Sequence, residues 1–188
     1  MKIASFLVYL MAIQTCFAGY LFAKDTKISP EKSRNRGAWK IQVSRSEMTD
    51  VKNVMLYLEA TKSIQSDFGP QRPDLILCCE EGELEAYINT GFILESGDYG
   101  TSPVRIRWDD SEPVSDNWTI STDHDAVFSR DPLDFIFKEL VSAKRLRFQF
   151  QPFNSGPKVA DFNVIGLSEH LSKLDNACPS AGIFNKNN

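Results

Sequence analysis

The chain has 188 residues and a formal net charge of −4 at pH 7. This acidic balance argues against a nucleic-acid partner, because proteins that bind nucleic acids usually present a basic surface. The length fits one domain with a sizeable core once a short N-terminal segment is set aside.

Residues 1–23 are predicted to be a secretory signal peptide. Lys2 supplies a positive charge, and an apolar run from Ile3 to Ile13 follows it. Ala18 and Ala23 are both candidates for the last residue of the signal. The apolar run is shorter than the roughly 20 residues that a transmembrane helix needs. We therefore expect export to the periplasm rather than anchoring in the membrane.

Residues 37–178 are predicted to form a single β-rich domain between a flexible leader, residues 24–36, and a disordered tail, residues 179–188. A continuous apolar run at Leu75–Cys79 indicates a strand that is buried on both faces. Apolar and polar residues alternate at Leu84–Asn89, as expected for a strand with one buried face. About nine such segments predict an all-β fold, either a β-sandwich or a partly closed barrel. The predicted strands begin near Trp39, Val54, Leu75, Leu84, Val104, Trp118, Val127, Leu146 and Ala160.

Two short helices are predicted to pack on the sheets. Asp131 suits the N-cap of the first helix, and Pro132 suits its first position. The second helix is expected to begin near Ser168. Residues 63–72, which include a Gly-Pro pair, are expected to form a loop. The apolar positions with helical spacing are Leu133, Ile136, Phe137, Leu140 and Val141 in the first helix and Leu167, Leu171, Leu174 and Cys178 in the second.

The sequence contains none of the common catalytic or metal-binding motifs. His124 is expected in a solvated turn and His170 on the polar face of a helix. The acidic residues of segment 109–116 favour a solvated turn, and a calcium-binding loop is the alternative, although the spacing is not that of an EF-hand. The glutamates of segment 80–85 favour a charged sheet edge over an acid/base pair. We therefore predict no catalytic residues, no metal and no cofactor.

Four arginines form a possible interaction face. Arg105 and Arg107 share one face of a strand, and Arg145 and Arg147 share one face of another. Pairing with acids on neighbouring strands is the favoured interpretation. The alternative is a basic face that binds an anionic glycan or a protein partner.

Five segments follow one another along the chain: GAWKIQVSRSEMTDVKNVMLYLEA, RPDLILCC, RIRWDDSEPVSDNWTISTDHDAVF, DPLDFIFKELVSAKRLRFQFQPFN and FNVIGL. In this order they resemble the type VI secretion system-associated VasI/TagO family. The resemblance covers residues 37–178 and includes Cys79 in the cysteine position of the family. It implies an exported accessory protein of Gram-negative bacteria.

A disulfide is predicted between Cys178 and Cys79, and Cys78 is the alternative partner. An oxidising compartment favours cysteine pairing. Cys178 lies on the apolar face of the last helix, and Cys79 shares a strand face with Leu75 and Leu77 in addition to its place in the family pattern. The adjacent Cys78 must point to the opposite face of the same strand.

We predict an exported periplasmic, non-enzymatic accessory or interaction protein that is associated with type VI secretion. Its expected partner is a protein of the cell envelope or the secretion apparatus, with no nucleic acid and no membrane span after signal cleavage. One alternative is a periplasmic enzyme that acts on cell-wall glycan or peptide. Another is a prophage-encoded or effector-associated envelope protein.

Overall fold

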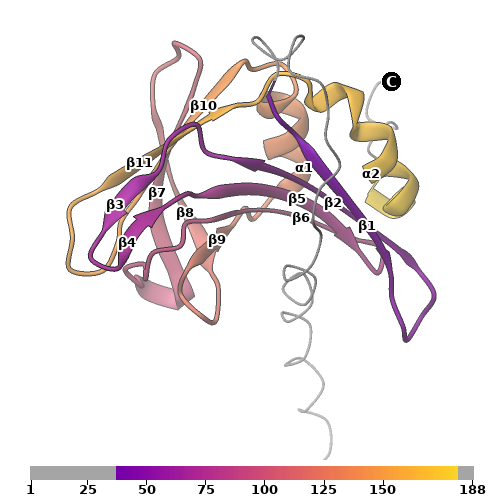
Figure 1. The fold of residues 1–188 in the computed structure, drawn as a ribbon, viewed down its shortest axis with the longest axis horizontal. Coiled ribbons are helices and arrows are strands. Elements are labelled where there is room, and N and C mark those ends of the chain that lie inside the picture. Colours follow the sequence, from indigo (N-terminus) through magenta and orange to yellow (C-terminus); the bar gives the residue numbers. More distant parts are fainter. Residues whose placement is uncertain (1–36, 182–188) are drawn as a thin grey trace, which may run out of the picture. The chain divides into compact units, whose positions relative to one another are not determined.

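The structure is a computed structural model, and it describes residues 37–181. The predicted signal peptide and leader, residues 1–36, lie outside the described part, and so do residues 182–188 of the predicted tail. Within the described part, nine strands form one sheet and two more strands form a small hairpin (Figure 1). The predicted all-β class is therefore confirmed, and the nine predicted strands correspond to those of the main sheet, to which the hairpin adds two.

The main sheet is antiparallel throughout, in the order β1-β2-β5-β6-β9-β8-β7-β10-β11. The short strand β9 links a half built around β5 to a half built around β7. The bounds are β1 Lys40–Arg45, β2 Lys52–Glu59, β5 Asp74–Glu80, β6 Glu83–Asn89, β7 Thr101–Trp108, β8 Val114–Ile120, β9 Ala126–Phe128, β10 Arg145–Phe150 and β11 Lys158–Asn163.

The inner side chains of both halves of the sheet form one hydrophobic core. The alternation that predicted the strands is visible in β2 and β10, where every second residue is buried. Trp118 from β8 and Phe148 from β10 are both fully buried, and their ring centroids lie 5.0 Å apart. β5 is buried on both faces along almost its whole length, as its continuous apolar run predicted.

The two ends of the sheet meet without closing it. The backbone N–H of Gly37 donates to the carbonyl of Ile165 at 2.8 Å, just ahead of β1 and just after β11. The indole Nε1 of Trp39 donates to the carbonyl of Val164 at 3.1 Å. A side chain at Gly37 would place its Cβ only 2.1 Å from the carbonyl oxygen of Asn163, so this contact requires glycine.

The first predicted helix is present in two parts. The helix α1, Pro132–Asp134, is capped by Asp131, whose carboxylate accepts the backbone N–H of Asp134 at 2.9 Å. It continues as a π-helical segment, η2, Phe135–Leu140. The wider π turn shifts the buried stripe, so Phe135 joins the core although the regular spacing does not include it. Its ring packs edge-on against Trp118, with centroids 5.0 Å apart.

The second helix, α2, Leu171–Ala177, follows a 3-10 turn, η3, Leu167–Glu169. The expected start near Ser168 is therefore early for the α-helix. The predicted apolar face is confirmed, because Leu167, Leu171, Leu174 and Cys178 are all buried. A further 3-10 turn, η4, Pro179–Ala181, extends into the predicted tail. In the part of the chain from 37 to 181, no helix is long and apolar enough to cross a membrane.

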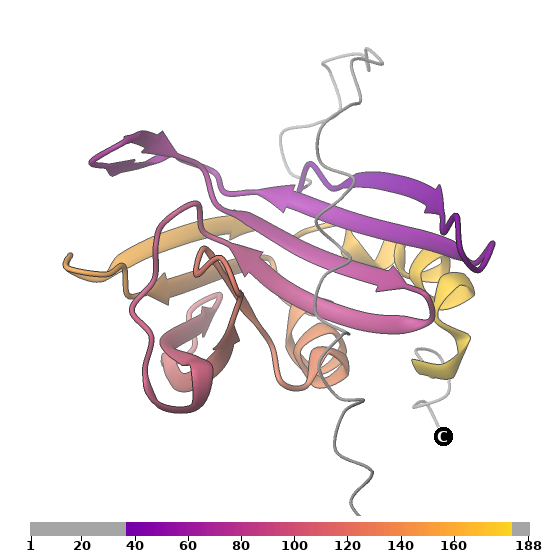
Figure 2. The ribbon, with the colours of Figure 1, turned by 90° about the horizontal axis from the view of Figure 1, so that it is seen from below.

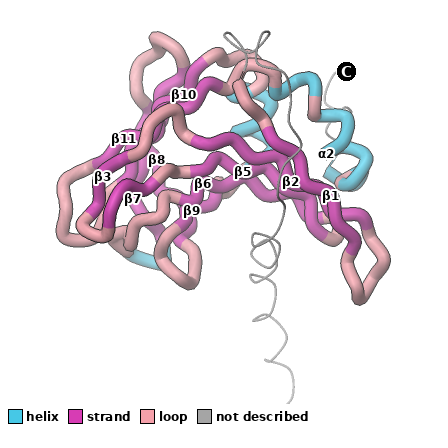
Figure 3. Tube along the Cα trace, viewed as in Figure 1, coloured by secondary structure: helices cyan, strands magenta, loops and turns pink. Residues whose placement is uncertain are grey.

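The segment predicted as a loop contains a short hairpin, β3, Ile64–Ser66, and β4, Gly69–Gln71 (Figure 3). Its strands have three residues each, which is too short for an apolar alternation to be recognised. Gly69 has a φ of 109°, and this conformation allows the chain to leave the tip of the hairpin. A smaller 3-10 turn, η1, Asp98–Gly100, precedes β7.

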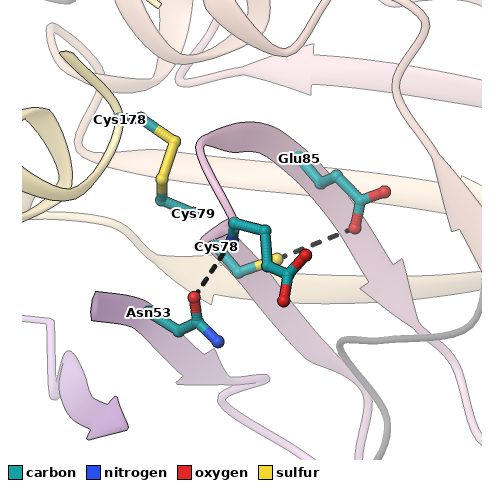
Figure 4. The surroundings of a disulfide bond; sticks show 6 residues. Asn53, Cys78, Cys79, Glu85 and Cys178 are labelled. Carbon is teal, nitrogen blue, oxygen red and sulfur yellow. Dashed lines mark hydrogen bonds between the residues drawn. A yellow bond between two sulfur atoms is a disulfide. The ribbon is translucent and has the colours of Figure 1, made fainter. Parts of the chain in front are cut away.

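The predicted disulfide between Cys79 and Cys178 is present (Figure 4). Their Cα atoms lie 5.7 Å apart, and the bond joins positions 99 residues apart in the sequence. It ties the end of α2 to β5, on the inner side of the sheet. Cys78 is buried on the other face of β5, and its sulfur lies 3.8 Å from a carboxylate oxygen of Glu85.

We predict that Cys178→Ala lowers the free energy of unfolding by up to about 4–5 kcal/mol, because the bond closes a long loop in the unfolded chain. The measurement is urea denaturation under non-reducing conditions. Cys79→Ala and the double variant should lose nearly the same amount, since all three lack the same bond. A double variant that loses the sum of the two single effects would contradict this account.

Candidate binding cleft

Four connections lie together at one end of the sheet: the β3–β4 hairpin, segment 90–97, the β8–β9 turn and the β10–β11 turn. In Figures 1 and 2 the hairpin and the β10–β11 turn lie at the end of the sheet away from α2. The backbone N–H of Phe153 donates to the carbonyl of Ile93 at 2.9 Å. The backbone N–H of Leu94 donates to the carbonyl of His124 at 2.7 Å. Segment 90–97 is therefore joined to both the β10–β11 turn and the β8–β9 turn.

These connections surround a cleft of about 550 Å³, a volume typical of ligand sites. Three large apolar side chains line it and remain open to solvent. Phe68 from the hairpin is 93% exposed, Ile93 is 57% exposed, and Phe153 is 60% exposed. Exposed apolar residues that gather on one surface mark a binding site more often than isolated ones do.

The segment that carries Ile93 is closely packed on both sides of this residue. Gly91 has a φ of 69°, and a Cβ at this position would lie 3.0 Å from the side-chain oxygen of Gln71 in the hairpin. Phe92 is buried below the cleft and packs against Phe150, with ring centroids 5.4 Å apart. The exposed Ile93 therefore projects from a segment whose neighbouring side chain is held in the core.

The rim of the cleft is mainly acidic. Asp67 and Asp123 are exposed, and Asp125 is half-buried. The carboxylate of Asp125 accepts a hydrogen bond from the Ser121 hydroxyl at 3.1 Å, which holds it in place. Lys158 is the basic residue of the lining. The cleft therefore combines apolar walls with an excess of negative charge.

The predicted arginine face lies on the outer side of β7 and β10, away from the cleft, and most of it holds the structure together. Arg145 pairs with Asp161 of β11 through its Nε, 2.9 Å from each carboxylate oxygen. Arg147 donates to the carbonyl of Asp109, and Arg107 donates to a loop carbonyl. Arg145 thus pairs with an acid on a neighbouring strand, while Arg107 and Arg147 contact the β7–β8 turn.

Arg105 is exposed and takes no part in these contacts. Within residues 37–181, no acidic group lies within ion-pair distance of its guanidinium. It borders a smaller groove of about 300 Å³ together with Asn117, Gln149 and Gln151. The function of this face as an interaction surface stays a prediction that depends chiefly on this one residue.

The acidic segment 109–116 is used in structural contacts. The carboxylate of Asp109 accepts the backbone N–H groups of Lys144 and Arg145 at 3.0 and 2.8 Å. Asp116 pairs with Arg130 at 2.9 Å. In the described residues, no group of three or more His, Cys, Asp or Glu side chains is arranged to hold a metal ion.

The two histidines lie apart in the fold. His124 is exposed in the β8–β9 turn, where its φ is 60°. His170 is half-buried ahead of α2 rather than fully on the surface, and burial, followed by the nearby Lys173, lowers its pKa. The tryptophans Trp39 and Trp118 are buried, while Trp108 is half-buried against Phe135.

The glutamates of segment 80–85 lie at the β5–β6 hairpin. β6 pairs with β9 only over Tyr87–Asn89, so the segment from Glu83 to Ala86 extends beyond its neighbouring strand. This partial edge fits the expected role of charge at a sheet edge. Burial raises the pKa of Glu85, and the nearby Glu80 and Glu83 raise it further.

No protein-family model matches the sequence, and no curated protein matches it significantly. Among solved structures, the crystal structure of invasion associated protein B from Bartonella henselae is similar to this chain, with a TM-score of 0.50 and 14% sequence identity. The match covers 75% of this chain and 94% of that chain. At this identity the similarity shows a shared fold and does not assign a ligand or a partner. The VasI/TagO resemblance therefore remains a prediction.

The cleft residues were not among the site residues predicted from the sequence. Phe68 and Phe153 each lie in a turn-rich segment, SDFGP and QPFNSGP respectively. A large aromatic residue among turn residues is the one signal that could have drawn attention to them, since turns are usually exposed.

We predict that Glu85→Gln stabilises the protein at neutral pH. The folded protein binds the Glu85 proton more tightly than the unfolded chain, so ionisation of Glu85 weakens folding as the pH rises above the ordinary glutamate pKa of 4.5. The gain in melting temperature should therefore be full at pH 7 and fade as the pH falls below the ordinary glutamate pKa. Glu95→Gln, at an exposed position elsewhere, is the matched control. A gain that persists unchanged at pH 3.5 would rule out this cause.

Proposed function

We propose that this protein is an exported, non-enzymatic interaction module that binds a protein partner through the four-loop cleft. The observation that carries the proposal is the convergence of Phe68, Ile93 and Phe153 on one open cleft. Full burial of an exposed apolar side chain contributes about 1.5–3 kcal/mol of favourable free energy. A partner that covers all three side chains gains most of this free energy for each of them. Large apolar anchors at the centre of a contact commonly dominate binding energy.

We further propose that the partner belongs to the cell envelope or to the type VI secretion apparatus, as the VasI/TagO resemblance implies. A disulfide-bonded β domain is consistent with an extracytoplasmic location, because disulfides persist in oxidising compartments. Loops at one end of a rigid β framework are a common place for binding residues. The framework here is fixed by the core and the disulfide, and the loops present the contact surface.

A photo-crosslinking amino acid at position 68 or 93 should yield one defined covalent adduct in the envelope of the producing cell. The same group at Tyr99 or Val159, which are also exposed but lie outside the cleft, should yield none. The measurement is an immunoblot of the full chain after irradiation, followed by mass spectrometry of the adduct. Equal adducts from all four positions would contradict binding at the cleft.

Loss of the gene should reduce the release of type VI substrates into the medium, and the wild-type chain should restore it. The variant Phe68→Ser/Phe153→Ser should fail to restore release although it is exported and folded, while Tyr99→Ser should restore it fully. Normal release without the gene would overturn the assignment to type VI secretion. Binding at the cleft would then be tested by the crosslinking experiment alone. Turnover of peptidoglycan by the purified protein would favour the enzyme alternative instead.

A further inference from the structure

We infer that the cleft recognises a cationic peptide segment, one in which a large apolar side chain is flanked by lysine or arginine. This inference rests on the proposed binding function and specifies the chemistry of the partner. The apolar part of the segment meets Phe68 and Phe153, which lie on the hairpin and on the β10–β11 turn. The cationic part meets the acidic rim.

Charge complementarity determines the sign of the charge that the partner carries. The lining contains the carboxylates of Asp67, Asp123 and Asp125 against the single ammonium group of Lys158, which leaves two negative charges. An anionic peptide or an anionic lipid surface would bring like charges together at this rim, and such contacts are unfavourable. A basic segment is attracted to the same carboxylates.

The carboxylates are placed for a peptide rather than for a metal ion. Asp67 lies in the β3–β4 hairpin, and Asp123 and Asp125 lie in the β8–β9 turn, with apolar side chains lining the cleft they border. Within residues 37–181 no acidic cluster is arranged to hold a metal. Asp125 is oriented by Ser121, so one carboxylate is already fixed where a cationic side chain can reach it.

The test is a selection from a displayed library of random dodecapeptides on the purified, disulfide-bonded protein, with Phe68→Ser/Phe153→Ser as the counter-selection. Peptides retained by the wild-type chain should combine a Phe, Leu, Met or Trp with neighbouring Lys or Arg, and they should be poor in Asp and Glu. An enriched peptide is then synthesised, and its binding is measured by fluorescence anisotropy at two salt concentrations.

Asp67→Asn/Asp123→Asn should weaken binding of that peptide by about tenfold and flatten its salt dependence, because two rim charges are removed. Glu47→Gln/Glu112→Gln removes two exposed charges outside the cleft and should leave binding unchanged. Phe153→Ser should weaken binding by at least about tenfold. Circular dichroism checks that each variant is folded.

Enrichment of acidic or uncharged peptides, or the same enrichment on the counter-selection variant, would overturn this inference. So would a dimer of the wild-type chain that Phe153→Ser dissociates, because the cleft would then be occupied by a second copy. A failure of the inference remains distinct from a failure of the proposed function. Crosslinks at positions 68 and 93 in the cell would still report a partner at the cleft even if the selected peptides were not cationic.

Discussion

The shape of the cleft depends on hydrogen bonds that hold the two ends of the sheet together. Near β1, Gly37 and Trp39 donate to carbonyls that follow β11. The backbone N–H of Thr61 donates to the carbonyl of Asp161 at 2.7 Å, just before the chain enters the β3–β4 hairpin. This last bond places the hairpin beside the strand that leaves the β10–β11 turn, so Phe68 and Phe153 come to line one cleft.

The disulfide and the helices support this arrangement from the inner side of the sheet. Cys178 ties the end of α2 to β5 through Cys79, and the leucines of α2 cover β2 and β5. The π-helical segment η2 fills the other half of the core through Phe135. The loops add Phe92 and Leu94 to the core, while Phe68, Ile93 and Phe153 remain exposed outside it.

Much of the fold follows from local patterns, while the site does not. Alternation in β2 and β10, the capping by Asp131 and the face that bears Cys178 are short-range signals, and the structure confirms them. The cleft joins Phe68, Ile93 and Phe153 from segments that are distant in sequence, so only the tertiary contacts bring them together. For the arginine face, the spacing in the sequence correctly indicates a shared surface. It does not indicate that Arg145 and Arg147 are already engaged by acids and carbonyls.

The most direct test of this account is the distance between the hairpin and the β10–β11 turn, measured by double electron–electron resonance. Spin labels on non-natural amino acids at positions 68 and 154 leave the native cysteines intact. The account predicts one narrow, short distance distribution in the native chain. Gly37→Val should broaden this distribution, because the valine side chain would collide with the carbonyl of Asn163. Ala38→Val, at the neighbouring exposed position, should leave the distribution narrow. A broad distribution in the native chain would show that the hairpin moves independently of the turn and would contradict the account.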